Sequence, residues 1–399
     1  MTRRVVITGG GAIGPLGGGV RALVEGVAAG RTALERTGRT CAARVRDTVG
    51  PGPFQPNVWR RLDRSSRLAA AAALEALRDP WFRAERGGPV GLVLGTMTAG
   101  LEPLHAFLTT LFTEGPESVS PMLFPFTVPN APASQCSVLF GLRGPSLTIS
   151  EMEASGLAAI VTAAGLVRDG ACDVIVAGGV DESVPEFDRA WERLRLVFRG
   201  DPVHFPGPFG RRRSGFVPGE GAYFVVLEPL EGAVRRGARV WAEVAGEALT
   251  HAPGPAHGWP SDPGAMADAI GLALSQARLR AEEVGYVAAG ANGSRALDAV
   301  EARAIRRALG PEARRVPVTS LKGAVGESGS ASAGAALVAA RSIREGFIPP
   351  VAGLVDPDPN LDLNLVVGSA RRGPVPSVVI DALGTGGCCA AVVLKRTGS

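Results

Sequence analysis

The chain has 399 residues, of which 46% are hydrophobic and 20% charged. This composition is typical of a large globular protein and excludes disordered and fibrous classes. The formal net charge is only +4, with 42 basic and 38 acidic residues and no dense basic tract, so nucleic acid is not an expected partner.

Apolar runs are too short for a membrane protein. The longest candidate, 154–167, stops at Arg168, short of the ~18 residues that a spanning helix needs. The N-terminus carries a four-residue apolar run before its glycines, which is too short for a signal-peptide core. We expect no membrane association and a cytoplasmic location.

Cysteine and histidine are sparse. The five cysteines form no CxxC pair, and the whole chain has four histidines. Neither a metal site nor a disulfide framework is expected, and a reducing compartment fits best.

The first half begins with a short β-rich run at 3–8 that enters a glycine turn and precedes a helix at 20–30. A helix is predicted at 64–77 from its alanine and leucine content, and a buried strand at 89–97. The region 101–135 is rich in Phe, Pro and Thr, which indicates loops around a short helix.

The central segment predicts a βαβ unit. A strand at 145–150 is followed by the helix 154–170 and by a second buried strand at 172–182. The helix is apolar on nearly all sides, which places it in the middle of a layered structure rather than on a surface.

The second half is predicted to contain the same kinds of element, buried strands that alternate with helices. Strands are predicted at 239–249 and 284–293, helices at 262–279, 296–309 and 330–346, and a closing hairpin at 376–396. Two halves of this kind suggest an internal duplication, divided into residues 1–230 and 231–399.

A glycine motif near the start imitates a dinucleotide-binding site. Gly9, Gly11 and Gly14 satisfy G-x-G-x-x-G directly after a strand. However, Pro15 and the run 17–19 break the helix that would have to begin there to bind a pyrophosphate. We therefore expect no nicotinamide, flavin or other cofactor.

Several motifs then occur in a recognisable order: "VVITGGGAIGPLGGGV", "FGLRGPSLTISEMEASGLAAI", "DVIVAGGVDE", "PFGRRRSGFVPGEGAYFVVLE", "ALDAVEARAIRRALG", "SLKGAVGESGSASAGAA" and "ALGTGGCCAAVVL". Together they resemble the β-ketoacyl-acyl carrier protein synthases, condensing enzymes of the thiolase fold, over nearly the whole chain. The resemblance implies an α/β protein of two duplicated αβαβα halves, packed as five layers and dimerised through the central sheets.

The family's chemistry uses a cysteine nucleophile at a helix start and two histidines. Counted along the motifs, these three positions fall on Glu153, Gly290 and Glu327. No catalytic residue is therefore expected. The loss of all three groups is similar to the chain length factors, the β subunits of type II polyketide synthases, although those typically carry Gln at the nucleophile position.

The resemblance implies a heterodimer with an active ketosynthase α subunit, in which this chain shapes the tunnel and acyl carrier protein docks mainly on the partner. Two alternatives stay open. One is a malonyl-carrier decarboxylase or acyltransferase that uses Glu153 in place of cysteine, and the other is a binding module that holds acyl carrier protein.

Further candidates have two interpretations each. Tunnel or interface contacts and ordinary core packing are both open for Phe124, Phe126, Val128 and Phe140. The cluster Arg211, Arg212 and Arg213 is either a solvated loop or a carrier-docking site. Cys388 and Cys389 are expected to be buried small hydrophobes, and Lys322 and Glu220 to form structural ion pairs.

Overall fold

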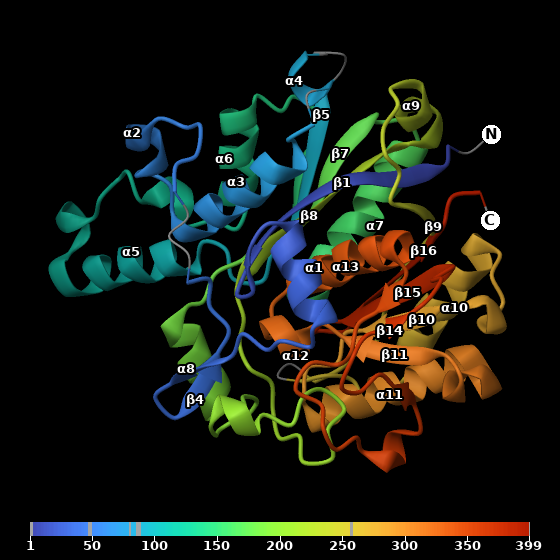
Figure 1. Ribbon diagram of the computed structural model, residues 1–399. Coiled ribbons are helices and arrows are strands. Elements are labelled where there is room, and N and C mark those ends of the chain that lie inside the picture. The colour runs from blue at the N-terminus through green and yellow to red at the C-terminus, as the bar shows by residue number, and fades with distance from the viewer. Residues whose placement is uncertain (1–2, 47–49, 80, 85–88, 256–257, 399) are drawn as a thin grey trace.

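The computed structural model describes residues 3–46, 50–79, 81–84, 89–255 and 258–398. Its main feature is a large sheet with helices on both faces and between its two sections (Figure 1). Strands of the first half are β1 (Val5–Gly14), β5 (Val90–Gly95), β6 (Ser146–Ile149), β7 (Val174–Asp181) and β8 (Gly221–Pro229). Strands of the second half are β9 (Ala242–His251), β10 (Tyr286–Ala289), β11 (Pro317–Ser320), β15 (Ser377–Leu383) and β16 (Cys388–Lys395).

The two halves share one strand order. The first section runs β6-β5-β7-β8-β1 and the second runs β11-β10-β15-β16-β9. In both sections the five strands of the half lie in the order third, second, fourth, fifth, first. This repeated topology is an internal duplication, and a short antiparallel pairing of β1 with β9 links the sections. A two-residue strand, β13 (Asn364–Leu365), extends the outer edge of the second section.

Five layers result from the helix positions. Helices α7 (Ser155–Arg168) and α13 (Ala331–Glu345) pack on each other between the two sections. Helix α3 (Arg64–Ala76) covers the outer face of the first section with α6 (Ala131–Phe140), and α10 (Gly264–Ala277) covers the second with α11 (Arg295–Leu309). The all-round apolar helix predicted at 154–170 is therefore a middle-layer helix, as expected.

The remaining helices are shorter or peripheral: α1 (Val20–Ala28), α2 (Pro56–Trp59), α4 (Trp81–Ala84), α5 (Leu101–Glu114), α8 (Pro185–Arg193), α9 (Leu230–Arg235) and α12 (Lys322–Val325). Short strand pairs β3 (Glu35–Thr37) with β4 (Thr40–Ala42), and β12 (Phe347–Ile348) with β14 (Arg371–Arg372), lie outside the main sheet, and β2 (Gly17–Gly18) extends β1. Because α9 packs against β1 and β8, it lies with the first half. We keep the division into residues 1–230 and 231–399 as a proposal.

The start of the chain differs from the sequence prediction. The strand does not end at residue 8 but continues through Gly14, so the three glycines lie inside β1. A Cβ on Gly11 would come within 1.9 Å of the Ala72 carbonyl oxygen on α3. The glycine motif therefore lets a helix approach a strand closely. The next helix, α1, begins only at Val20, whose backbone N–H donates to the Glu75 carboxylate, so this helix start already holds an anionic group of the chain itself.

The region 101–135 also differs, because it holds more helix than predicted. Instead of loops around one short helix, it contains the 14-residue helix α5 and the start of α6. Pro103 is the only buried residue of α5, and this helix extends from the body of the protein at the left of Figure 1. Because its apolar side chains do not pack on a core of this chain, they need not recur on one face of the helix. The amphipathic spacing that identifies a helix from sequence is therefore weak here.

Candidate functional site: a buried polar network between the two halves

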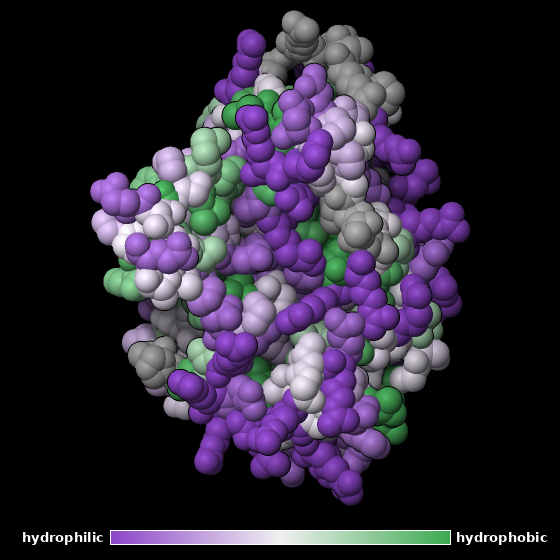
Figure 2. All heavy atoms as spheres, turned by 90° about the vertical axis from the view of Figure 1, so that its left-hand side faces the viewer, coloured by the Kyte–Doolittle hydropathy of each residue, from purple (hydrophilic) through white to green (hydrophobic). Residues whose placement is uncertain are grey.

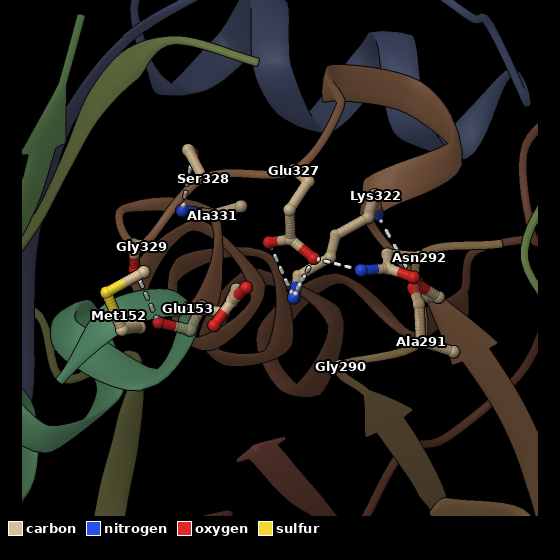
Figure 3. A network of polar contacts seen from close by, with 12 residues as sticks. Met152, Glu153, Gly290, Ala291, Asn292, Lys322, Glu327, Ser328, Gly329 and Ala331 are labelled. Atoms are coloured by element: carbon tan, nitrogen blue, oxygen red, sulfur yellow. Dashed lines mark hydrogen bonds and ion pairs between the residues drawn. The ribbon is translucent and has the colours of Figure 1, made fainter. Parts of the chain in front are cut away.

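The three positions that correspond to the family's nucleophile and histidines come together where the two halves meet. Glu153 lies in a single 3-10 turn (Met152–Ala154) just before α7, Gly290 follows β10, and Glu327 lies between α12 and α13. Figure 3 shows Glu153 and Glu327 on facing elements, with Lys322 and Asn292 beside Glu327. The three positions that the resemblance implies as replaced catalytic positions therefore lie near one another in the fold.

Glu153 is only 3% exposed, and its carboxylate is held by one residue of the opposite half. The backbone N–H of Thr385 donates to Oε2 at 2.6 Å, and the Thr385 hydroxyl donates to Oε1 at 2.9 Å. Thr385 belongs to the glycine turn between β15 and β16, which brings its amide across to the start of α7. Both oxygens of Glu153 are thus bound within the chain, so the cost of burying the carboxylate is offset.

The backbone at this position is unusual. Met152, directly before Glu153, has a φ of 51°, in the left-handed region that non-glycine residues rarely occupy. Such a conformation costs on the order of 1–3 kcal/mol and is kept where the surroundings fix it. Here the next side chain, Glu153, is aimed at the glycine turn.

Glu327 forms a buried ion pair. Lys322 Nζ lies 2.8 Å from Oε1 and 2.9 Å from Oε2, and Asn292 Nδ2 donates to Oε2 at 2.6 Å. Burial raises the pKa of Glu327 to about 7, the Lys322 ammonium opposes that rise, and the Glu153 charge adds to it. A carboxylate here cannot stabilise a developing enolate in the way that a histidine does.

Gly290 offers no side chain, and its surroundings leave little room for one. Its N–H donates to Glu301 Oε1 at 2.7 Å and to Asp381 Oδ1 at 3.2 Å. A Cβ at this position would lie 3.1 Å from Glu301 Oε1. Burial and the neighbouring Asp381 charge raise the pKa of Glu301 well above its usual value.

Two residues of this site were not singled out from the sequence. Thr385 lies in the glycine turn of the motif "ALGTGGCCAAVVL", and its contact with Glu153 spans 232 positions. Asp181, at the end of β7, accepts from Met97, Thr98 and Ser330 backbone N–H groups. The acidic pair that ends the buried strand "VIVAGGVDE" is the feature that could have identified Asp181.

Lys322 and Glu220 both form buried ion pairs, as expected, but with different partners. Glu220 is bound by the guanidinium of Arg64, with Nε at 2.9 Å from Oε2, and by the backbone N–H of Val45 at 2.7 Å. Cys388 and Cys389 are buried and free. Burial raises the pKa of their thiols to about 12 and about 11, which keeps both protonated and removes them as nucleophiles.

The sequence matches two family models, the β-ketoacyl synthase N-terminal domain over residues 2–233 and the C-terminal domain over residues 241–355. The chain belongs to the β-ketoacyl synthase family. It is 35% identical to a granaticin polyketide putative β-ketoacyl synthase 1 of Streptomyces violaceoruber, with 99% of both chains covered. It is 36% identical to an oxytetracycline polyketide putative β-ketoacyl synthase 1 of Streptomyces rimosus, with 99% of this chain and 98% of the relative covered.

Solved ketosynthase structures have the same fold. The ishigamide ketosynthase/chain length factor superimposes with a TM-score of 0.90 at 27% identity, covering 100% of both chains. A type II PKS ketosynthase in complex with its acyl-carrier protein and bound to the hexaketide superimposes with a TM-score of 0.91 at 24% identity, covering 100% of both chains. The thiolase fold expected from the sequence motifs is therefore confirmed.

The four predicted tunnel or interface residues fall into two groups. Phe124 is 61% exposed and Val128 is 40% exposed. Phe126 and Phe140 are partly buried and pack against the apolar cluster beneath α3 and β5. Phe124 and Val128 are thus exposed toward a possible partner and Phe126 and Phe140 contact the core, and a tunnel or interface role stays a prediction for all four.

Phe124 and Val128 belong to a set of exposed apolar residues on α5 and on the segments that follow it up to residue 147, which we call the α5 face. Figure 2 looks at this side of the molecule, where apolar side chains interrupt a polar surface. The face comprises Leu108, Phe112, Met122, Phe124, Val128, Val138 and Leu147. Apolar surfaces of this kind mark sites where another molecule binds.

An open cavity of about 570 Å³ lies beside α5, away from Glu153. Its walls are largely charged and include Asp63, Arg64, Arg67 and Glu102. It does not reach the three replaced catalytic positions, none of which lines it.

The structure contradicts the predicted carrier-docking role for one residue of the arginine cluster. Arg213 is 5% exposed, with Nη1 at 2.7 Å from Asp358 Oδ2 and Nε at 3.5 Å from Asp298 Oδ2. The prediction that Arg213 docks a carrier is therefore wrong, because its charge is neutralised inside the protein. Arg211 and Arg212 are exposed and stay carrier-docking candidates.

No helix in the described ranges is both long and apolar enough to cross a membrane.

Proposed function

We propose that the chain is a non-condensing ketosynthase-like subunit, a chain length factor, which pairs with an active ketosynthase and helps set polyketide length. The observation that carries this proposal is the bonding of Glu153. At the nucleophile position stands a carboxylate whose two oxygens are both bound by Thr385. A carboxylate is a weaker nucleophile than a thiolate, and here it also occupies the hydrogen-bond donors that an acyl oxygen would need.

The other two positions support the same assignment. Gly290 has no side chain to act on a substrate, and Glu327 is committed to its ion pair with Lys322. The polyketide synthase relatives of the chain supply the context of type II polyketide synthesis. The similar structure of the ishigamide ketosynthase/chain length factor is the precedent for pairing this chain with a ketosynthase.

The α5 face supports a heterodimer with a ketosynthase α subunit. Stable interfaces bury apolar side chains that are otherwise exposed. We propose that α5 and the segment 121–140 form that interface and part of the tunnel wall, and that acyl carrier protein docks mainly on the partner. The buried, free cysteines support a reducing cytoplasmic location.

Co-purification tests the pairing. The chain is coexpressed with candidate ketosynthase α subunits, and Phe124→Asp should abolish the complex because it places a charge in an apolar interface. Val203→Asp is the matched control, since Val203 is 87% exposed and lies outside the α5 face. If Phe124→Asp and Val203→Asp co-purify equally well with every partner, the proposed interface is wrong.

Product analysis tests the catalytic assignment. The heterodimer is assembled once with the wild-type chain and once with Glu153→Ala, and each is supplied with malonyl carrier protein. The two should make a polyketide product of the same length and in the same amount. A decarboxylase or acyltransferase that uses Glu153 would instead convert malonyl carrier protein to acetyl carrier protein without the partner and would lose this activity in Glu153→Ala. Mass spectrometry of the carrier distinguishes the two, and acetyl carrier protein formed by the chain alone would refute the proposal.

A further inference from the structure

Helix α5 carries two residues of the α5 face, Leu108 and Phe112, but it is anchored to the rest of the chain near its start. Pro103, in its first turn, is its only buried residue. The helix packs mainly on the two short turns that follow it, Pro116–Ser118 and Phe124–Phe126, rather than on a strand or a longer helix. Beside it lies the open cavity of about 570 Å³, which is lined from both α3 and α5. The direction of α5 therefore depends on how its first turn is fixed.

One buried carboxyl, that of Glu182, joins the starts of α3 and α5. Glu182 directly follows β7 and is 1% exposed. Its Oε1 accepts from the backbone N–H of Glu102 in the first turn of α5, at 3.3 Å, and its Oε2 accepts from the backbone N–H of Ser65 in the first turn of α3, at 3.1 Å. First-turn N–H groups have no partner within their own helix, so an acceptor from elsewhere in the chain satisfies them. Because the two oxygens belong to one carboxyl group, this bridge fixes the start of α5 relative to α3.

The backbone of Glu182 is tied to the segment that leads into α5. The Thr98 hydroxyl donates to the Glu182 carbonyl oxygen at 2.8 Å and accepts from the Glu182 N–H at 3.1 Å. Two residues later, Gly100 has a φ of 83°, and a Cβ there would lie 3.0 Å from the Val128 carbonyl oxygen. The chain thus turns into α5 at a fixed point, and the Glu182 carboxyl then sets the direction of the first turn.

The carboxyl of Glu182 makes this bridge in acidic surroundings. Burial raises its pKa to about 8, the charges of Asp63 and Glu102 add to the rise, and the two backbone N–H groups oppose it. The nearby Arg64 guanidinium is bound to Glu220. In the described part of the chain, the direct hydrogen-bond partners of this carboxyl are therefore the two helix starts.

We propose that Glu182 is a positioning residue for partner binding, because it fixes the angle at which α5 leaves the body and thereby places the α5 face against the ketosynthase subunit. Glu182 is buried and acts through the helix rather than by touching the partner. The inference rests on the proposed function, in which the α5 face is the interface.

The length of α5 makes its angle important. Phe112 is ten residues beyond Glu102, about 15 Å along the helix axis at 1.5 Å per residue. A tilt of about 10° at the first turn would displace Phe112 by about 3 Å at that length. The backbones of preorganised interfaces move by about 1 Å or less on binding, so such a displacement would misalign the α5 face.

Hydrogen–deuterium exchange of the intact chain, combined with the dissociation constant of the coexpressed heterodimer from ultracentrifugation, tests this role. Glu182→Ala removes both acceptors, and Glu182→Asp keeps a carboxyl that is one methylene too short to reach both helix starts. Each should speed exchange in residues 101–114 and weaken the heterodimer, both by about tenfold, because two hydrogen bonds are lost.

Glu243→Ala is the matched control, since Glu243 is 6% exposed and accepts from Arg4 rather than from α5. It should leave exchange in residues 101–114 and the dissociation constant within twofold of the wild type. Thermal melting checks that all three variants are folded.

Two results would overturn the inference while the proposed function stands. One is exchange in residues 101–114 that is unchanged in both Glu182 variants, or that rises no more than in the rest of the chain. The other is faster exchange confined to residues 101–114 with a dissociation constant within twofold of the wild type. If the wild-type chain pairs with no ketosynthase α subunit, the proposed function is refuted and the inference falls with it.

Discussion

The buried pair of Lys322 and Glu327 should respond unequally to the loss of either partner. Both side chains are at most 4% exposed, with Nζ and Oε1 2.8 Å apart. Glu327→Gln leaves the Lys322 ammonium without its anion, and breaking a buried pair in this way costs about 3–5 kcal/mol. Lys322→Met should cost less at pH 7, about 1 kcal/mol, because a Glu327 whose pKa is already about 7 can take up a proton.

The difference should depend on pH. In Lys322→Met the pKa of Glu327 rises above 7, since the opposing ammonium is gone. Glu327 then holds a proton in the folded Lys322→Met protein and loses it on unfolding, so the free energy of unfolding of this variant falls as pH rises. In the wild type the free energy of unfolding stops falling near pH 7, because the pKa of Glu327 in the folded protein is about 7. Between pH 7 and pH 8.5 the cost of Lys322→Met should therefore grow by about 2 kcal/mol, at 1.36 kcal/mol per pH unit.

Urea denaturation followed by tryptophan fluorescence, at pH 6, 7 and 8.5 and at one protein concentration, measures these values. Arg21→Met is the control, because Arg21 forms a surface pair with Glu25 and is 87% exposed; its midpoint should not move. Equal costs for Lys322→Met and Glu327→Gln at pH 7, or a cost of Lys322→Met that does not rise with pH, would refute the reasoning.

Three further predictions concern other buried positions. Burial raises the pKa of Glu182 to about 8, so the native state holds a proton that the unfolded state loses, and stability should fall between pH 5 and pH 8; Glu182→Gln should flatten that slope in denaturation curves. Gly290→His, combined with Glu153→Cys and Glu327→His, should restore no condensation in a radiolabelled malonyl assay, because the new Cβ would lie 3.1 Å from Glu301 Oε1; product formation would contradict this. Gly11→Ala should lower the free energy of unfolding by about 1–3 kcal/mol through its contact with Ala72, whereas Gly50→Ala, with no atom within 4 Å of the new Cβ, should not.

The sequence by itself determined the layered α/β architecture. The all-round apolar helix before Arg168 could only lie between covered layers, and the structure places α7 there. The hairpin predicted at 376–396 is the β15–β16 pair. Spacing along the motifs also located Glu153, Gly290 and Glu327. These features depend on local periodicity and on motif order, which a sequence carries directly.

Only the tertiary structure decided how the buried charges are bound. Thr385 reaches Glu153, and Asn292 reaches Glu327, across long sequence separations that no periodicity encodes. The same limit explains why Arg213, which looked like a surface charge at the end of an arginine run, proved to be buried against Asp298 and Asp358. Hydrophobic pattern sets which elements form, but the pairing of polar groups follows from how those elements pack.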